Sequence, residues 1–286
     1  MSNETADEVL KAWETSSQYW NKHQALIEKM FVPLTQALIE EAQIVAGQSV
    51  LDIGGGSGEP SLTIAGVVGP SGRVTFTDPT AGMVKASRER AQQRGLKNIE
   101  FHQAGAEKLP FADNSFDVAV GRLSSMFFSD VPGALREILR VLKPGGRLAF
   151  LVWADREFNP FFTVIGDVLN QFVPAEPEGE DAPTAFRFAR PGKLANLLAQ
   201  AGAVSVKEHT LKFDTEAPID SSQFWAFRTE MSDSFRTKLG KLGPAEVNAA
   251  RDAVVKASAP YFQSGTMRFP SQALIVSGRK PEMVGE

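Results

Sequence analysis

Hydrophobic and polar positions alternate between a strand pattern and a helix pattern along the first half of the chain. Short runs of β-branched and aromatic residues, typical of strands, cover residues 50–53, 73–77, 98–102, 116–120 and 147–153. Segments with helical signals lie between them, at residues 60–68, 80–94 and 131–142. In the last of these segments the spacing i, i+3, i+4 and i+7 of one buried helix face is occupied by Leu135, Ile138, Leu139 and Leu142. Strands separated by helix-length segments predict right-handed βαβ units and a doubly wound α/β fold.

The second half of the chain loses this alternation. Residues 147–153 form an almost continuous apolar run, which indicates a strand buried on both faces of a parallel sheet. Residues 155–190 are then rich in Phe, Pro and acids, and residues 174–181 predict an exposed loop. Helical signals return at 191–201 and 218–262, and further strands are expected at 203–213 and 272–277. We therefore expect a mostly parallel, seven-stranded Rossmann-like sheet with helical cap or lid insertions.

The same pattern suggests how the 286 residues are organised. A chain of this length can form one large domain with an elaborate cap. The expected parts are an N-terminal helical lid (1–44), a nucleotide-binding core (45–153), an insertion or cap (154–190), a core helix and strand (191–213), a helical cap insertion (214–268) and a final core strand with its tail (269–286).

A glycine-rich turn follows the first expected strand. Glycines stand at alternate positions after the acid Asp52, namely Gly54, Gly56 and Gly58. Glycine allows a tight turn and a close approach of the backbone to a ligand. The first amides of the helix that follows have no partner within that helix, so they point toward the same space. The arrangement predicts a nucleotide-binding turn.

Spacing and charge exclude two common kinds of nucleotide turn. A dinucleotide fingerprint, G-x-G-x-x-G, would need a third glycine where Glu59 or Ser61 stands. A P-loop would need a lysine, and the turn contains none. The Glu59 carboxylate would also repel a pyrophosphate. The remaining pattern, D-x-G-x-G-x-G, suits a cationic or zwitterionic ligand.

Composition narrows the classes of function. The net charge of −4 gives no electrostatic sign of nucleic-acid or anionic-membrane binding. The chain has no cysteine, and its histidines (His23, His102 and His209) are far apart in sequence, so we expect no metal site. The N-terminus lacks the apolar segment of a signal peptide, and no apolar run is long enough to span a bilayer. The sequence therefore predicts a cytoplasmic protein without membrane insertion.

A series of landmarks resembles those of class I S-adenosylmethionine-dependent methyltransferases. In order they are residues 50–58, 78–83 (Asp-Pro-Thr-Ala-Gly-Met), 105–111 (Gly-Ala-Glu-Lys-Leu-Pro-Phe), 115–118 (Ser-Phe-Asp-Val) and 142–146 (Leu-Lys-Pro-Gly-Gly). The resemblance is strong over residues 45–153. It is closest to the small-molecule branch that includes the ubiquinone/menaquinone-biosynthesis C-methyltransferases. It implies S-adenosylmethionine as the cofactor and S-adenosylhomocysteine as the product.

The resemblance also implies where the nucleoside of the cofactor would lie. Asp78 would accept both ribose hydroxyls, although a carboxylate there also suits a helix N-cap. Pro79 and Met83 would pack on the adenine faces, or else only on the helix. Ala106 and Glu107 would place a backbone N–H at an adenine ring nitrogen. At Gly105 the chain departs from its relatives, which commonly carry an Asp that accepts from the adenine amino group, so one hydrogen bond worth about 0.5–1.5 kcal/mol is in question.

The methionine part of the cofactor would lie between two turns. The resemblance places it near Gly54, Gly121 and Arg122, where main-chain carbonyls would take its ammonium group. Asp52 would add a negative charge nearby or would only tether the turn. Arg122 would alternatively pair with an acid, Asp117 or Asp130, away from the ligand.

The sequence names no catalytic residue. Methyl transfer is an in-line displacement from a sulfonium, so the protein mainly positions and desolvates the nucleophile. A general base is needed only when the acceptor carries a proton to lose. The candidate bases are Tyr19, His23, His102 and His209, each of which is better explained as a structural residue.

The acceptor is expected to be a small hydrophobic or aromatic molecule, because aromatic residues are plentiful in the segments outside the βαβ units. They are Trp13, Tyr19, Trp20, Phe127, Phe128, Trp153, Phe158, Phe161, Phe162, Phe224, Trp225 and Phe227. Asn159-Pro160-Phe161 echoes a motif of nucleic-acid methyltransferases, but it lacks their second proline and follows the fifth strand instead of the fourth. We expect no nucleic-acid partner, and a monomer or a homodimer. The alternatives are an NAD(P)-dependent oxidoreductase and a non-catalytic protein that binds S-adenosylmethionine or S-adenosylhomocysteine.

Overall fold

The computed structural model describes residues 3–175, 179 and 181–282, which are built around one large sheet. The strand order is β3-β2-β1-β4-β5-β8-β6, and β7 pairs with β8 off this path. The strands are β1 (Ser49–Ile53), β2 (Arg73–Asp78), β3 (Ile99–Gln103), β4 (Phe116–Arg122), β5 (Leu142–Trp153), β6 (Val204–Ala217), β7 (Phe262–Gln263) and β8 (Thr266–Arg279). Pairing is parallel from β3 to β5 and antiparallel where β8 joins β5 and β6. The predicted mostly parallel sheet is confirmed, with a short eighth strand added.

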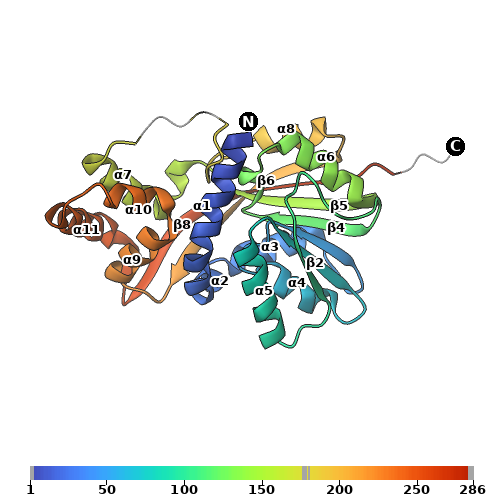
Figure 1. The fold of residues 1–286 in the computed structure, drawn as a ribbon, viewed down its shortest axis with the longest axis horizontal. Helices are drawn as coiled ribbons and strands as arrows, with labels where there is room; N and C mark the ends of the chain where they lie inside the picture. The colour runs from blue at the N-terminus through green and yellow to red at the C-terminus, as the bar shows by residue number, and fades with distance from the viewer. Residues whose placement is uncertain (1–2, 176–178, 180, 283–286) are drawn as a thin grey trace.

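Helices cover both faces of this sheet. Among them, α3, α4 and α5 lie on one side, and α6 and α8 lie on the other (Figure 1). The helices are α1 (Asn3–Lys22), α2 (Gln24–Met30), α3 (Val32–Ala42), α4 (Ser61–Val68), α5 (Ala81–Gln93), α6 (Val131–Val141), α7 (Pro160–Phe172), α8 (Lys193–Gln200), α9 (Ser221–Met231), α10 (Asp233–Leu239) and α11 (Pro244–Ser258). The doubly wound fold is therefore confirmed. Within the described residues, no helix combines the length and apolar character needed to cross a membrane.

The hydrophobic core lies where the sequence pattern places it. The apolar run of β5 is completely buried from Leu148 to Val152, because α3 and α6 both contact this strand. Leu34 and Leu38 of α3 are also fully buried. Although α3 lies within the N-terminal segment expected to be a lid, it contacts β4, β5 and β8 as part of the core layer.

The order of the strands creates a crevice at one edge of the sheet. β1 lies between β2 and β4, and both of its partners run parallel to it. The chain leaves β1 toward β2 and β3 on one side and then returns to the other side as β4. In open α/β sheets, ligands bind beyond the carboxyl ends of the strands at such a switch point. Here the last residues of β1, β2 and β4 are Ile53, Asp78 and Arg122.

The part of the fold that the sequence did not reveal is the long hairpin that carries the helical cap. β6 and β8 pair from Val204–Arg279 to Ala217–Met267, well beyond the predicted strands. α7, α9, α10 and α11 gather at the far end of this hairpin (Figure 1). The sequence analysis missed α7, whose buried residues include Phe161, Ile165 and Leu169, because its Phe- and Pro-rich composition hides that spacing. Of the predicted exposed loop at 174–181, residues 174, 175, 179 and 181 are described, and all four are exposed and lie outside helices and strands.

Asn159 ties the start of the cap to the sheet. Its side chain is fully buried, and its Nδ2 donates to the carbonyl oxygens of Ala154, Asp155 and Gln272 at 3.0–3.1 Å. Its Oδ1 accepts from the Gln272 amide at 3.1 Å. The Asn-Pro-Phe sequence at 159–161 thus joins the end of β5 to β8 through backbone groups of the protein itself.

We predict that Asn159→Ala lowers the free energy of unfolding by at least about 2 kcal/mol, because the Ala154 carbonyl oxygen and the Gln272 amide both lose their partner, at about 1–3 kcal/mol each. Urea denaturation followed by circular dichroism would measure the change. Asn196→Ala, at an exposed position of α8, is the control and should differ from wild type by less than about 0.5 kcal/mol. Equal stability of the two variants would show that the Asn159 bonds contribute little.

Candidate functional site

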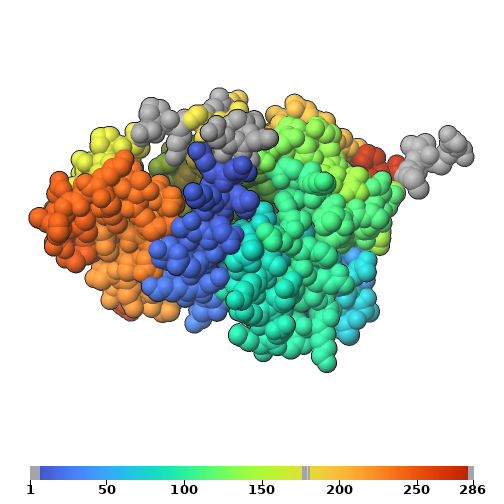
Figure 2. Space-filling view, viewed as in Figure 1, coloured from blue at the N-terminus to red at the C-terminus, as the bar shows by residue number. Residues whose placement is uncertain are grey.

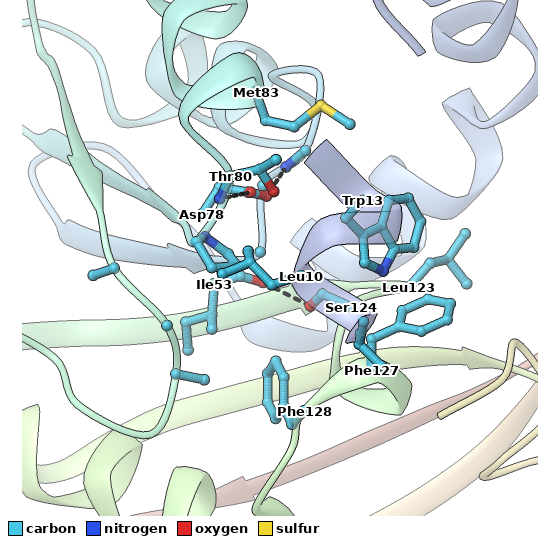
Figure 3. Close-up of a pocket in the computed structure, with 18 of the residues that line it drawn as sticks. Leu10, Trp13, Ile53, Asp78, Thr80, Met83, Leu123, Ser124, Phe127 and Phe128 are labelled. Atoms are coloured by element: carbon cyan, nitrogen blue, oxygen red, sulfur yellow. Dashed lines mark hydrogen bonds between the residues drawn. The ribbon is translucent and has the colours of Figure 1, made fainter. Parts of the chain in front are cut away.

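A cavity of about 290 Å³ opens at the carboxyl ends of β1, β2 and β4. Nine of the twelve residues predicted to bind cofactor line it: Gly54, Gly56, Asp78, Pro79, Met83, Gly105, Ala106, Glu107 and Arg122. The other predicted residues, Asp52, Gly58 and Gly121, do not line it. Additional lining comes from positions that carried no sequence signal, including Leu10, Thr80, Leu123 and Ser124 (Figure 3).

The glycine turn is held against two neighbouring strands. The Gly54 and Gly55 amides both donate to the Thr77 carbonyl oxygen of β2, at 2.8 and 3.0 Å. On the other side, Ser124 Oγ donates to the Ile53 carbonyl oxygen at 2.6 Å. Gly54 has a φ of +67°, and a Cβ at this position would lie 2.6 Å from the Cβ of Ser124. A larger residue is therefore excluded both by backbone conformation and by space.

Asp78 is held at the cavity by amides from two separate turns. Its Oδ2 accepts from the Gly56 amide at 3.0 Å, and its Oδ1 accepts from the Thr80 amide at 2.9 Å (Figure 3). The side chain is nevertheless 6% exposed, and burial raises the pKa of this carboxyl group. Thr80 itself occupies the N-cap position of α5, so Asp78 orders the turn just before the helix. Each carboxylate oxygen has lone pairs left for a further donor.

Asp52 lies beneath the turn and not in the cavity. Its Oδ2 accepts from Ser61 Oγ, at the start of α4, at 2.6 Å. Its Oδ1 is buried and has no hydrogen-bond partner. Burial raises the pKa of this carboxyl group to about 7. The geometry matches the expected alternative in which Asp52 tethers the turn.

Arg122 connects three segments at the edge of the cavity. Its guanidinium donates to Thr35 Oγ1 of α3 at 2.7 Å and to the Glu59 carbonyl oxygen at 3.0 Å. The predicted alternative partners are engaged elsewhere: Asp117 binds Lys143, and Asp130 caps α6. The alternative prediction, that Arg122 pairs with Asp117 or Asp130, is therefore wrong.

Glu107 lies next to Gly105, where the chain departs from its relatives. Its Oε1 accepts from the Ser129 amide and from Ser129 Oγ, both at 2.8 Å. A Cβ placed on Gly105 would lie 3.0 Å from Glu107 Oε2. This second oxygen therefore occupies the neighbourhood in which an aspartate side chain at position 105 would project.

Much of the remaining lining of the cavity is apolar, and α1 contributes part of it. Leu10, Trp13, Phe127 and Phe128 face one another across it (Figure 3), and the rings of Trp13 and Phe127 meet edge to face at 4.9 Å. In the space-filling view, α1 lies between the cap and the sheet (Figure 2). The Glu14 carboxylate accepts from the Gly82 amide of α5 at 3.2 Å, which holds α1 against α5.

The four candidate bases lie outside this cavity. His23 contacts Glu230 at 2.6 Å, His102 contacts Glu100 at 3.8 Å, and His209 contacts Glu41 at 3.7 Å. The ring of Tyr19 packs under the Arg236 guanidinium. Among the described residues, the ionisable groups that line the cavity are Asp7, Glu59, Asp78, Glu107 and Arg122.

Comparisons with known proteins find relatives for part of this chain. Residues 51–150 match the family described as "Methyltransferase domain". The ubiquinone/menaquinone biosynthesis C-methyltransferase UbiE of Ectopseudomonas mendocina is 41% identical over 138 residues, which are 48% of this chain and 54% of the relative. The chain thus spans about half the length of the curated relatives it matches. The predicted resemblance to class I S-adenosylmethionine-dependent methyltransferases is confirmed over this segment.

Solved structures extend the similarity of fold to most of the chain. A chain of the complex between the Haloferax volcanii Trm112 methyltransferase activator and a putative methyltransferase has a TM-score of 0.58 at 18% identity, covering 96% of this chain and 99% of that chain. A putative methyltransferase from Bacillus halodurans has a TM-score of 0.55 at 20% identity, covering 86% of this chain and 98% of that chain. At this identity the likeness shows a shared fold alone.

The raised pKa of Asp52 predicts a specific pH dependence of stability. Because the native pKa of about 7 exceeds the ordinary value of 3.8, the native state binds more protons than the unfolded state between these values. The contribution of Asp52 to stability is therefore complete below about pH 4 and is lost as the pH rises through 7. Each unit of pKa difference corresponds to about 1.4 kcal/mol.

Asp52→Asn should remove this dependence, since the amide stays neutral. Urea unfolding at several pH values should show the variant gaining stability relative to wild type from pH 4 to pH 8. Asp252→Asn, at a largely exposed side chain, serves as the control and should follow the wild-type curve. Parallel curves for Asp52→Asn and wild type would show that Asp52 has an ordinary native pKa.

Proposed function

We propose that this protein transfers the methyl group of S-adenosylmethionine to a small apolar or aromatic molecule and releases S-adenosylhomocysteine. The observation that carries this proposal is the Asp78 carboxylate, which the Gly56 and Thr80 amides hold at the rim of a cavity. The cavity combines this fixed acceptor with the apolar surface beneath α1. The name of the UbiE relative, a C-methyltransferase, agrees with this reaction.

The proposed placement of the cofactor uses the edge of the sheet from β3 to β4. The ribose hydroxyls would donate to Asp78, and the adenine would lie between Met83 and Ala106, which both line the cavity. The methionine part would extend toward Gly54 and Arg122. A dinucleotide is disfavoured because Glu59, an acid paired with Arg94, stands where the pyrophosphate would meet the start of α4.

The proposed chemistry needs little from ionisable side chains. The acceptor atom forms a bond to the methyl carbon as the carbon–sulfur bond breaks, and sulfur leaves as a neutral thioether. The protein would hold the two reactants in line and exclude water. Since the described lining of the cavity holds carboxylates but no His, Tyr or Lys, we expect an acceptor that arrives as an anion, such as a phenolate or an enolate, so that its attacking atom has no proton to lose.

We further propose that α1 and α2 form a lid over this site. Trp13 and Trp20 of α1 line the cavity, so a movement of this helix would change access to it. The cap built from α7, α9, α10 and α11 would then provide the outer wall against which the lid closes. The expectation of a monomer or a homodimer stays a prediction.

Calorimetric titration tests the cofactor. We predict that S-adenosylhomocysteine binds and that NADH does not. Asp78→Ala should lower the affinity for S-adenosylhomocysteine about 10- to 100-fold, because hydrogen bonds to a charged group are worth about 1.5–3 kcal/mol. Asp113→Ala, which changes an exposed acid far from the cavity lining, is the control. Unchanged affinity in Asp78→Ala would remove this residue from the site, and binding of NADH alone would overturn the proposed function.

We also propose that Glu107 replaces the carboxylate missing at position 105. Its Oε1 is fixed by Ser129, so Oε2 remains to accept from the adenine amino group. The wild type should therefore bind S-adenosylhomocysteine about 10-fold more tightly than the analogue in which inosine replaces adenosine, since the analogue presents a carbonyl oxygen to the carboxylate.

Glu107→Gln should reduce this preference, because its amide can donate to the inosine carbonyl, and Gly105→Asp added to Glu107→Gln should restore it. Glu100→Gln, which alters an exposed acid on β3, should leave the preference unchanged. Calorimetric titration of each variant with both ligands gives the ratio of their dissociation constants. An equal preference in wild type and Glu107→Gln would contradict this role of Glu107.

A further inference from the structure

A buried arginine in the cap has no anionic partner. Arg228 of α9 is only 8% exposed. Its guanidinium lies over the rings of Phe161 and Phe162 of α7, at 4.5 and 4.8 Å from their centroids. The ring of Phe235 of α10 lies at 5.7 Å. Aromatic side chains from two further helices thus surround this cation.

No described residue accepts a hydrogen bond from this guanidinium. Its Nε is buried without a partner, and the described ion pairs do not include Arg228. The acids nearest in sequence are engaged: Glu230 binds Lys22 and His23, and Asp233 binds Arg236. Burial without a compensating charge lowers the pKa of Arg228 to about 9.

The contacts with aromatic rings are too weak to offset the cost of burying the Arg228 charge. Cation–π contacts contribute about 0.5–2 kcal/mol, whereas burial of an unpaired charge costs several kcal/mol. Rings cover the faces of a guanidinium but offer no acceptor to its in-plane fork of N–H donors, and the buried Nε of Arg228 has no partner. That fork of donors matches the two oxygens of a carboxylate, sulfate or phosphate group.

We infer that Arg228 is an oxyanion-binding residue of the cap, and that it takes the anionic group of a ligand between α7, α9 and α10. This site uses none of the residues that line the cofactor cavity. A series of ring contacts joins the two places, because Phe162 contacts Trp153 at 4.8 Å and Trp153 contacts Phe31 of the cavity lining at 5.8 Å. The anion is either the charged end of an aromatic molecule or a free inorganic ion.

Thermal unfolding tests this inference with three probes, namely sodium benzoate, 3-phenylpropionate and phosphate, against sodium chloride at equal ionic strength. The midpoint temperature of unfolding of the wild type should rise with the concentration of at least one probe and then level off. Arg228→Met should lose this rise, and Arg228→Lys should keep only part of it. Arg268→Met, at an exposed arginine paired with acids, should respond like wild type.

The probes also separate the two sources of the anion. A rise with the aryl carboxylates alone indicates the charged end of an aromatic ligand, and a rise with phosphate as well indicates a general oxyanion site. Without any probe, Arg228→Met should unfold at the same temperature as wild type or higher, because an apolar side chain replaces an unpaired buried charge.

Two results would overturn the inference. One is an equal response of wild type and Arg228→Met to every probe. The other is a lack of response in the wild type together with a lower midpoint for Arg228→Met, which would show that Arg228 serves packing alone. Neither result bears on the cofactor, because the titration with S-adenosylhomocysteine uses a different cavity and different variants.

Discussion

The site depends on one constraint. The glycine turn that follows β1 lies very close to both β2 and β4. Gly54 touches Ser124 on one side and bonds to Thr77 on the other, so the carboxyl ends of three parallel strands meet at one point. The same turn presents the Gly56 amide to Asp78. A side chain at Gly54 would push β4 away and would separate Asp78 from the turn that orients it.

Two buried acids at this point have different environments and therefore different roles. Asp78 shares its oxygens between two backbone amides and remains accessible from the cavity. Asp52 lies one layer deeper, bonds to Ser61 and has an oxygen without a partner. The carboxylate that lines the cavity suits recognition of a ligand, whereas the deeper one links strand, turn and helix. Burial raises the pKa of both groups, so the turn is stabilised by packing and hydrogen bonds at some electrostatic cost.

The core and the cavity rim could be predicted because local patterns encode them. The parallel βαβ units follow from the alternation of strand and helix signals, the glycine turn follows from its spacing, and Asp78 follows from the resemblance to a known family. The presence of cap insertions could be predicted, but their packing could not, since the buried face of α7 is hidden in a Phe-rich segment and its partners on α9 and α11 are distant in sequence. Contacts across the fold also decide the roles of single residues. The burial of Asp52, the position of Glu107 Oε2 and the unpaired state of Arg228 all depend on such contacts.

The central claim is that the crevice beyond β1, β2 and β4 is a nucleoside site organised by Asp78. A crystal structure of the protein with bound S-adenosylhomocysteine tests it most directly. The account predicts that both ribose hydroxyls lie within hydrogen-bond distance of the Asp78 carboxylate and that the homocysteine sulfur faces the aromatic space beneath α1. Density for the ligand elsewhere, or a ribose that makes no contact with Asp78, would contradict the account.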